Sequence, residues 1–203
     1  MLNTQLSDCG IIILAAGKSG RMGRPKFLLE HVSGETFLHR LITVYQRAGI
    51  NEMVVVVNSI DFENQLEYFS TLPERVKIIQ NPTPEKGRLL SIQLGAGALS
   101  GNIPCFIHNI DNPFVEITLL EQLRRSLEES GYVKPVFAGK GGHPILISDS
   151  IVAALRNVTN EFQDFKQLLD SFYGKRLEVE FEEVLLNVNT REEYRLFLKK
   201  PFI

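Results

Sequence analysis

A dense set of glycines and basic residues follows the first apolar run of the chain and could bind an anion. Residues 11–16 have the composition of a buried strand, and the next ten positions alternate glycine with lysine and arginine. Glycines allow positive φ and let backbone N–H groups approach phosphate oxygens, while Lys and Arg supply charge. The set comprises Gly17, Gly20, Gly23, Lys18, Arg21, Arg24 and Lys26. It matches neither the Walker A nor the GxGxxG pattern, so we predict another kind of phosphate loop, with a solvated turn as the alternative.

Four short apolar runs predict the strands that must position this loop. They cover residues 10–16, 52–58, 75–80 and 105–111. Helical patterns between them give the order of βαβ units, which form a parallel sheet. Ligands of open parallel sheets bind at the carboxyl ends of the strands. The glycine loop and Asp111, which follows the fourth run, are therefore expected to meet there, with Asn58 and Asn81 at neighbouring strand ends.

Apolar periodicity and capping patterns predict the helices. A helix is expected over residues 35–49, with Phe37, Leu41 and either Val44 or Tyr45 buried and Gly49 at its end. A second is expected over residues 61–72, with Phe62, Leu66 and Phe69 buried. A third is expected to begin at a capping box of Thr118 and Glu121 and to end at Gly131. The motif LGAGALSG, residues 94–101, follows a helical pattern, and we interpret it as close helix packing.

The second half of the chain has a different element order. Residues 132–139 and 143–148 could pair as a hairpin, residues 176–181 and 184–188 are candidate strands, and Thr190 with Glu193 forms a capping box for a final helix. We predict a three-layer α/β/α fold, Rossmann-like, with a mostly parallel sheet and antiparallel additions in the C-terminal half. Residues 1–203 are expected to form a single domain.

Composition and charge narrow the class of protein. The 203 residues include 44% hydrophobic and 23% charged side chains, which is typical of a globular chain with a sizeable core. A formal net charge of -2 argues against nucleic acid as a partner. Cys9 and Cys105 are not spaced as in a disulfide-rich framework. The first residues lack the basic region of a signal peptide, and the apolar runs are too short to span a membrane. A cytoplasmic protein without membrane contact is therefore expected.

Four segments, in order, resemble a known family. The loop LAAGKSGRMGRPK, residues 14–26, is similar to the signature loop of the MobA-like NTP transferases, which include the molybdenum-cofactor cytidylyl- and guanylyltransferases. NPTPEKGRLLSIQLG resembles the family's glycine-led helix start, NIDNPFV its Asp-x-Pro element, and GKGGHPILIS its Gly-His-Pro segment near the second substrate. The resemblance spans most of the chain and implies the nucleotide-diphospho-sugar transferase-like fold.

The resemblance also implies an activity and residue roles. A Mg²⁺-dependent nucleotidyltransferase would move an NMP group from an NTP, CTP or GTP, to a phosphorylated small molecule and release pyrophosphate. The base and ribose would contact the backbone of Leu14, Ala15, Ala16 and Gly17, and Ser91 would face the nucleotide. Arg21 and Lys26 would hold the triphosphate, and Asp111 would hold Mg²⁺ with Asn189 as a further ligand. The acceptor would contact Gly142, His143 and Pro144. Residues 1–115 would then form the NTP-binding half and residues 116–203 the acceptor-binding half.

Some positions depart from the family pattern. Cytidylyl-type members commonly carry Asp-x-Asp-Thr where this chain has Asn187 and Asn189, and an amide contributes no charge to a metal. Ala16 resembles the cytidylyl type, because guanylyl enzymes usually have a glycine there, so CMP is favoured over GMP. Residues 159–169 lack a segment seen in many cytidylyl members. The acceptor therefore stays open between molybdopterin and a sugar or polyol phosphate, and a nucleotide-binding module without turnover is the remaining alternative.

Overall fold

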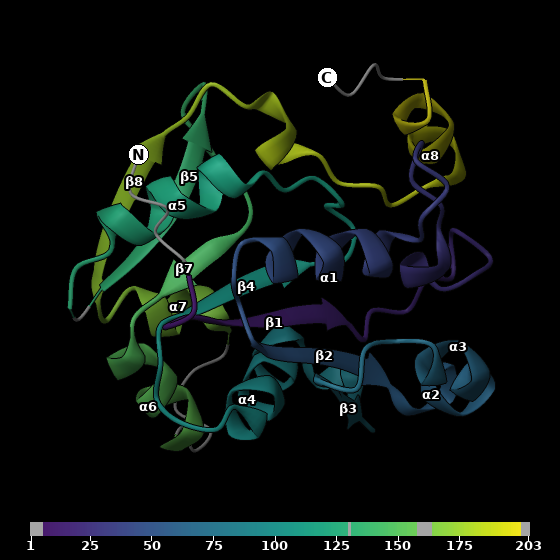
Figure 1. Cartoon of the computed structure of the whole chain (residues 1–203), viewed down its shortest axis with the longest axis horizontal. Coiled ribbons are helices and arrows are strands. Elements are labelled where there is room, and N and C mark those ends of the chain that lie inside the picture. The colour runs from purple at the N-terminus through teal and green to yellow at the C-terminus, as the bar shows by residue number, and fades with distance from the viewer. Residues whose placement is uncertain (1–5, 130, 158–163, 200–203) are drawn as a thin grey trace.

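A mostly parallel sheet forms the centre of the molecule, and its strands follow the apolar runs of the sequence (Figure 1). The computed structural model describes residues 6–129, 131–157 and 164–199. Its strands are β1 Gly10–Ala15, β2 Glu52–Asn58, β3 Val76–Asn81, β4 Cys105–Asn109, β5 Gly131–Phe137, β6 Lys140–Gly141, β7 Ile145–Ile147 and β8 Tyr173–Glu178. The order across the sheet is β3-β2-β1-β4-β7-β5-β6, and β8 pairs with β5.

The strand directions confirm the predicted mixture. β1 pairs in parallel with β2 and β4, and β2 pairs in parallel with β3, so all four predicted parallel strands are present. β7 is antiparallel to both β4 and β5, and its pairing of Tyr132 with Ile147 and Val133 with Leu146 confirms the predicted hairpin. β8 returns to pair in parallel with β5.

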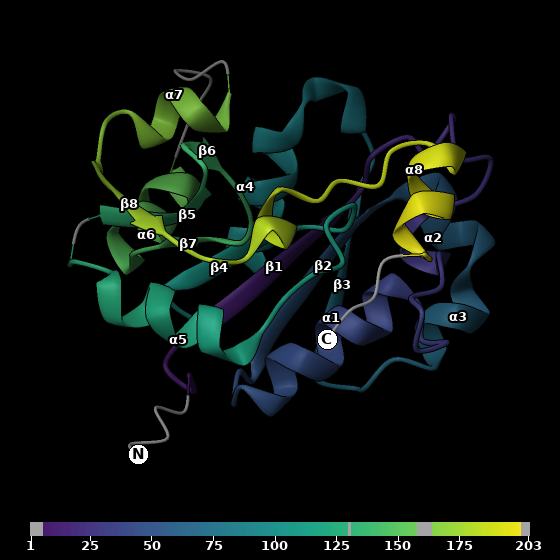
Figure 2. The same cartoon turned by 90° about the horizontal axis from the view of Figure 1, so that it is seen from above.

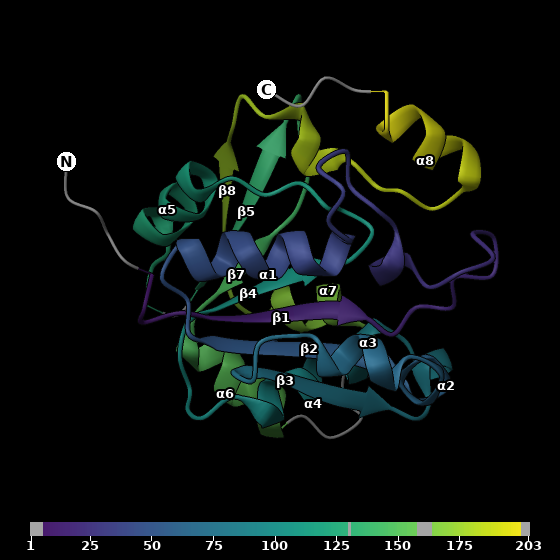
Figure 3. The same ribbon diagram turned by 45° about the vertical axis from the view of Figure 1, so that its right-hand side comes forward.

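Helices cover both faces of the sheet, as the three-layer prediction requires. They are α1 Phe37–Arg47, α2 Ser59–Asn64, α3 Leu66–Ser70, α4 Arg88–Ala98, α5 Ile117–Ser126, α6 Asp149–Asn157, α7 Phe165–Leu169 and α8 Arg191–Phe197, with 3-10 turns at Lys26–Leu28, Pro84–Lys86 and Glu182–Leu185. Figure 3 shows α1 and α5 on one face and α4 and α6 on the other. No helix within the described ranges is long and apolar enough to cross a membrane.

The central strand β1 is buried on both faces and divides the core in two. Its side chains alternate: Ile11, Ile13 and Ala15 pack in the core under α1 and α5. Ile12 and Leu14 pack in the second core, which α4, α6 and α7 cover. This alternation explains the continuous apolar run and decides which side chains after the strand can face a ligand.

Two helix ends agree with the sequence patterns. The Thr36 side chain accepts from the backbone N–H of His39 and caps α1, and Gly49 takes φ 91° just beyond its last turn. The capping box of Thr190 and Glu193 is present at the start of α8. Figures 1 and 2 show α8 together with α2 and α3 at the end of the sheet toward which β1 runs.

Three sequence predictions are wrong in detail. The helix expected over 61–72 breaks at Gln65 into α2 and α3, and Leu66 is 55% exposed instead of buried. Thr118 lies inside α5, which begins after Glu116 without a side-chain cap, and Gly131 opens β5 instead of ending the helix. Residues 184–188 do not form a strand, because the chain makes a 3-10 turn at Glu182–Leu185 and then runs back toward Asp111.

Candidate active site

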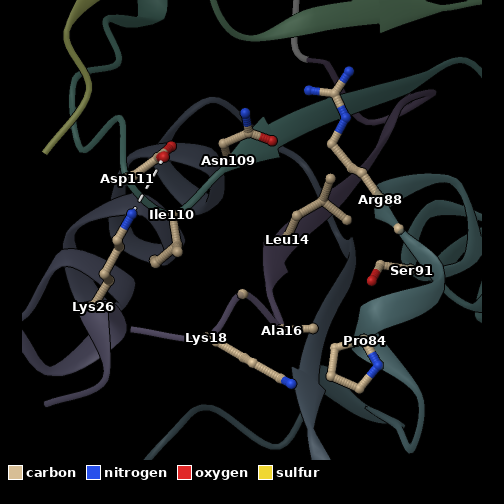
Figure 4. A pocket seen from close by; sticks show the side chains of 12 residues that line it. Leu14, Ala16, Lys18, Lys26, Pro84, Arg88, Ser91, Asn109, Ile110 and Asp111 are labelled. Atoms are coloured by element: carbon tan, nitrogen blue, oxygen red, sulfur yellow. Dashed lines mark hydrogen bonds and ion pairs between the residues drawn. The ribbon is translucent and has the colours of Figure 1, made fainter. Parts of the chain in front are cut away.

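The carboxyl ends of β1 and β4 meet beside a pocket of about 260 Å³. Leu14 on β1 is the register partner of Asn109 on β4, so the residues that follow these two strands lie close together. The pocket is lined by Leu14, Ala16, Gly17, Lys18, Lys26, Pro84, Gly87, Arg88, Ser91, Asn109, Ile110 and Asp111. Figure 4 shows side chains from three separate segments directed into it. This arrangement confirms the expected meeting of the glycine loop with Asp111.

The strand alternation sets the orientation of the loop after β1. Leu14 and Ala16 face the pocket, whereas the Ala15 side chain packs in the opposite core, so only the backbone of Ala15 can serve a ligand. Gly17 lines the pocket, and a Cβ there would meet nothing within 4 Å. The Ser19 hydroxyl accepts from the backbone N–H of Lys26 at 3.2 Å and fixes the return of the loop.

Lys26 joins the loop to the far end of the chain. Its Nζ donates to Asn189 Oδ1 at 2.6 Å and lies 3.5 Å from Asp111 Oδ2. The backbone N–H of Val188 donates to the Asp111 carbonyl at 2.8 Å, which holds the segment carrying Asn189 in place. The side chains of Lys26 and Asp111 are 16% and 22% exposed, so the pair stays accessible from the pocket.

Helix α4 begins at the pocket and contributes three lining residues. Gly87 takes φ 96° and starts the helix without a side-chain cap. Uncapped N–H groups at a helix start, together with the helix dipole, favour an anion. Ser91, one turn into the helix, is only 5% exposed, and its Oγ accepts from Asn81 Nδ2 at 2.9 Å. Asn81 therefore orients Ser91 toward the pocket, which agrees with the role expected for Ser91.

The two arginines of the loop lie away from the pocket. Arg21 is exposed and is absent from the lining of this pocket, while the Arg24 guanidinium lies 5.8 Å from the ring centre of Tyr194 on α8. Arg191 at the start of α8 donates to the carbonyl of Met22 at 3.2 Å. The basic residues of the loop therefore lie in two places: Lys18 and Lys26 line the pocket, and the arginines lie toward α8. A contact between Arg21 and a triphosphate would require the loop to move.

The expected acceptor residues lie next to the pocket, beyond Asn109. Asn109 Nδ2 and His143 Nε2 lie 3.0 Å apart and form a hydrogen bond. Burial, followed by the positive charges of Arg88 and Lys134, lowers the pKa of His143 to about 4. The peptide bond between His143 and Pro144 is cis. Gly142 does not line the pocket; it lies against the backbone of Val184, where a Cβ would overlap the carbonyl.

A divalent cation fits this donor set only with help from a substrate. Asp111 Oδ1 is buried and has no hydrogen-bond partner among the described residues, as expected of an oxygen available for another ligand. Among the described residues, no group of three or more His, Cys, Asp or Glu side chains is placed so that it could hold a metal ion. Mg²⁺ commonly takes one or two carboxylates and completes its shell with water and substrate phosphates, so a single Asp111 suits it. The metal role expected for Asn189 gains no support, because its amide oxygen is bonded to Lys26.

Sequence reasoning missed several lining residues. The sequence motifs did not single out Arg88 or Asn109. Arg88 begins α4 and Asn109 ends β4, so both lie at the edge of the sheet where a ligand was predicted. Asn58, which was expected at a neighbouring strand end, accepts from the backbone N–H of Asp61 and caps α2. Of residues 159–169, which lack the segment seen in many cytidylyl members, positions 159–163 lie outside the described residues.

Comparison with known proteins agrees with this geometry. Residues 11–178 match the model of the MobA-like NTP transferase domain. The chain is 29% identical over 190 residues to the molybdenum cofactor cytidylyltransferase of Escherichia coli (strain K12), covering 92% of this chain and 93% of that protein. It is also 29% identical over 205 residues to a probable molybdenum cofactor guanylyltransferase of Bacillus mycoides (strain KBAB4), with coverage of 93% and 95%.

Solved structures show the same fold. A nucleotidyl transferase from Methanothermobacter thermautotroptrophicus superposes with a TM-score of 0.73 at 20% identity, covering 94% of this chain and 97% of that one. The shared sheet and its helices account for where the pocket lies.

Proposed function

Because the chain belongs to the MobA-like NTP transferase family and is a nucleotidyltransferase, we propose that it moves an NMP group, CMP in preference to GMP, to a phosphorylated small molecule with the aid of Mg²⁺. The observation that carries this proposal is the pairing of Lys26 with Asp111 at the mouth of the pocket. One group neutralises phosphate charge and the other holds a cation. The first half of the single domain, residues 1–115, supplies both.

The reaction needs placement and charge neutralisation more than proton transfer. A phosphate oxygen of the acceptor attacks the α-phosphorus of the NTP, a P–O bond forms, and the bond from the α-phosphorus to the bridging oxygen breaks. The electron pair of that bond leaves with pyrophosphate. Lys26 stabilises the negative charge on the α-phosphoryl oxygens, and the uncapped start of α4 offers N–H groups to the nucleotide phosphates. The attacking oxygen is already ionised, so no general base is required.

Asp111, through the Oδ1 that has no hydrogen-bond partner among the described residues, would hold Mg²⁺, and the metal would supply neutralisation of charge on the triphosphate. Asn189 then acts on the lysine and not on the metal. By fixing Nζ at 2.6 Å, it holds the Lys26 side chain across the entrance of the pocket. A neutral amide at this position, unlike a carboxylate, neutralises none of the positive charge of Lys26.

Two features support the choice of substrates. The methyl group of Ala16 faces the pocket beside Leu14, and a smaller pyrimidine leaves more room there than a purine does. The relatives named above act on the molybdenum cofactor by their names, which makes molybdopterin the first acceptor to test. A sugar or polyol phosphate would use the same loop, so the acceptor side, residues 116–203, must discriminate.

The test measures nucleotide binding first and turnover second. We expect CTP to bind more tightly than GTP, UTP or ATP, and only with Mg²⁺ present. In pyrophosphate-release assays, Lys26→Met should lower the rate by about 10²–10³-fold, as removal of a charge-stabilising donor does elsewhere. Lys175→Met, which replaces a lysine on β8 outside the pocket lining, is the matched control and should leave the rate unchanged. Pyrophosphate release that survives in both Lys26→Met and Asp111→Asn would contradict the mechanism.

A further inference from the structure

Two cationic side chains lie side by side on neighbouring strands away from the nucleotide pocket. Lys134 on β5 and Arg176 on β8 are register partners in a parallel pair, so their side chains leave the sheet on the same face. Like charges directly opposite each other destabilise a sheet. The ion pairs recorded in the described part of the chain involve neither residue. Arg176 donates instead to the carbonyl of Gly139 at 2.7 Å.

Further positive charges surround Lys134. Burial, and then the charges of Arg88, Arg176 and Lys166, lower the pKa of Lys134. Arg88, at the start of α4, extends toward α7. Its guanidinium lies 5.6 Å from the ring centre of Phe165, the residue next to Lys166 on α7.

Two carboxylates near this cluster act on Arg88, and a third, Glu178, lies two residues beyond Arg176 on the same face of β8. Asp164 and Asp111 each raise the pKa of Arg88, although burial lowers it by more. Neither carboxylate is among the groups that act on Lys134. No ion pair recorded among the described residues joins Lys134, Arg176 or Glu178 to a partner.

The cationic group continues from the acceptor edge of the active site. Arg88 lines the nucleotide pocket, and Figure 4 shows its guanidinium on the side of Asn109, away from Lys18 and Pro84. Asn109 bonds to His143, and both Arg88 and Lys134 act on that histidine. Arg88 therefore belongs both to the lining of the pocket and to the charged groups around His143, which include Lys134.

We propose that Lys134 and Arg176 bind a second anionic group of the acceptor, so that the acceptor carries a carboxylate or phosphate in addition to the phosphate that attacks the nucleotide. This inference rests on the proposed function and narrows its substrate class. An unpaired like-charge pair costs stability in the free protein, and an anionic ligand offsets that cost. Arginine offers a planar fork for carboxylate or phosphate, and lysine adds a point charge.

Two probes of equal carbon count separate the effect of the second charge. Glycerol 3-phosphate carries one anionic group and 3-phosphoglycerate carries two. Each is titrated by calorimetry into the protein saturated with Mg²⁺ and the α,β-methylene analogue of CTP. We expect 3-phosphoglycerate to bind about 10-fold more tightly, the ratio that one charge-assisted hydrogen bond provides.

Variants assign the preference to its residues. Lys134→Gln and Arg176→Gln should bind the two probes equally. Lys175→Gln is the matched control, since Lys175 neighbours Arg176 on β8 but points to the opposite face, and it should keep the full preference. The thermal midpoint of Lys134→Gln should equal or exceed that of the parent, because repulsion has been removed. A fall of several degrees in the thermal midpoint would show that Lys134 stabilises the fold, and it would overturn the inference.

The remaining outcomes are also decisive. Equal affinity of the two probes for the parent, binding of neither probe, or a preference that survives in Lys134→Gln would each overturn the second anionic subsite. Failure of the proposed function looks different, because the CTP analogue itself would then fail to bind. Nucleotide binding without any preference between the probes contradicts only the present inference.

Discussion

Gly95 allows α4 to lie directly on the central strand, and adding one methyl group there tests how firmly this contact positions the site. A Cβ at Gly95 would lie 2.5 Å from Cγ2 of Ile12, with two more atoms of Ile12 at 3.1 and 3.2 Å. Gly97, two residues later on the same helix, is exposed, and a Cβ there meets nothing within 4 Å. Gly97→Ala is therefore the matched control.

The expected magnitude follows from these distances. Ordinary contact begins near 3.4 Å, so Gly95→Ala forces α4 or Ile12 to move by 0.9 Å, the difference between 3.4 and 2.5 Å. Ile12 is fully buried and β-branched, so its rotamer cannot change freely. Overpacking of this kind costs up to about 3 kcal/mol, and alanine in place of helical glycine returns about 1 kcal/mol. We expect Gly95→Ala to lose about 2 kcal/mol and Gly97→Ala to gain about 1 kcal/mol.

Urea unfolding of the parent and both variants measures this difference from the transition midpoints at a common slope. The shift should also reach the site, because α4 carries Arg88 and Ser91 into the pocket. Calorimetry should then show weaker CTP binding for Gly95→Ala and unchanged binding for Gly97→Ala. Equal stability of the two variants would refute the close contact with Ile12 as the reason for glycine at position 95.

Three further predictions concern the base, the lysine and pH. Ala16→Gly should raise affinity for GTP relative to CTP, because it removes the methyl group that faces the pocket; an unchanged ratio in competition binding would show that base choice lies elsewhere. Asn189→Ala should lower the rate of pyrophosphate release about 10-fold, since Lys26 loses its 2.6 Å acceptor, and a rate within twofold of the parent would remove Asn189 from the mechanism. Burial, and then the charge of His143, lower the pKa of His108 from 6.5 to about 3, so the stability that the neutral ring provides above pH 6.5 is lost as pH falls toward 3. The free energy of unfolding should drop by about 2 kcal/mol from His108 alone between pH 6.5 and 5, and an equally steep decline in His108→Phe would contradict this source.

The sequence predicted which segments of the proposed nucleotide side meet at the pocket, because most of these residues are close in the sequence. Leu14, Ala16, Gly17 and Lys26 belong to one short loop, and Asp111 follows the next strand of the sheet, so the strand-end rule brings them together. Ala15 shows what alternation adds. The residues on either side of it face the pocket, while its own side chain faces the opposite core.

The proposed acceptor side could be predicted only in part. The sequence pointed to Gly142, His143 and Pro144, but the other contacts depend on packing between distant elements. Arg88 becomes a pocket residue only when Gly87 turns the chain into α4. Lys134 and Arg176 are partners only because β8 returns in parallel beside β5, which no local pattern indicates. Residues 184–188 have strand-like composition, yet Val188 bonds to the backbone of Asp111 and the segment runs along the site instead of joining the sheet.

The bond between Lys26 and Asn189 spans 163 positions and has a consequence for the chain as it is made. The ribosome releases the N-terminal strands first, so Lys26 and Asp111 leave it long before Asn189 does. Until then the lysine has no amide acceptor, and the backbone N–H of Val188 is missing from Asp111. The nascent chain can therefore form most of its sheet, while the candidate site is completed only when the segment that carries Val188 and Asn189 docks.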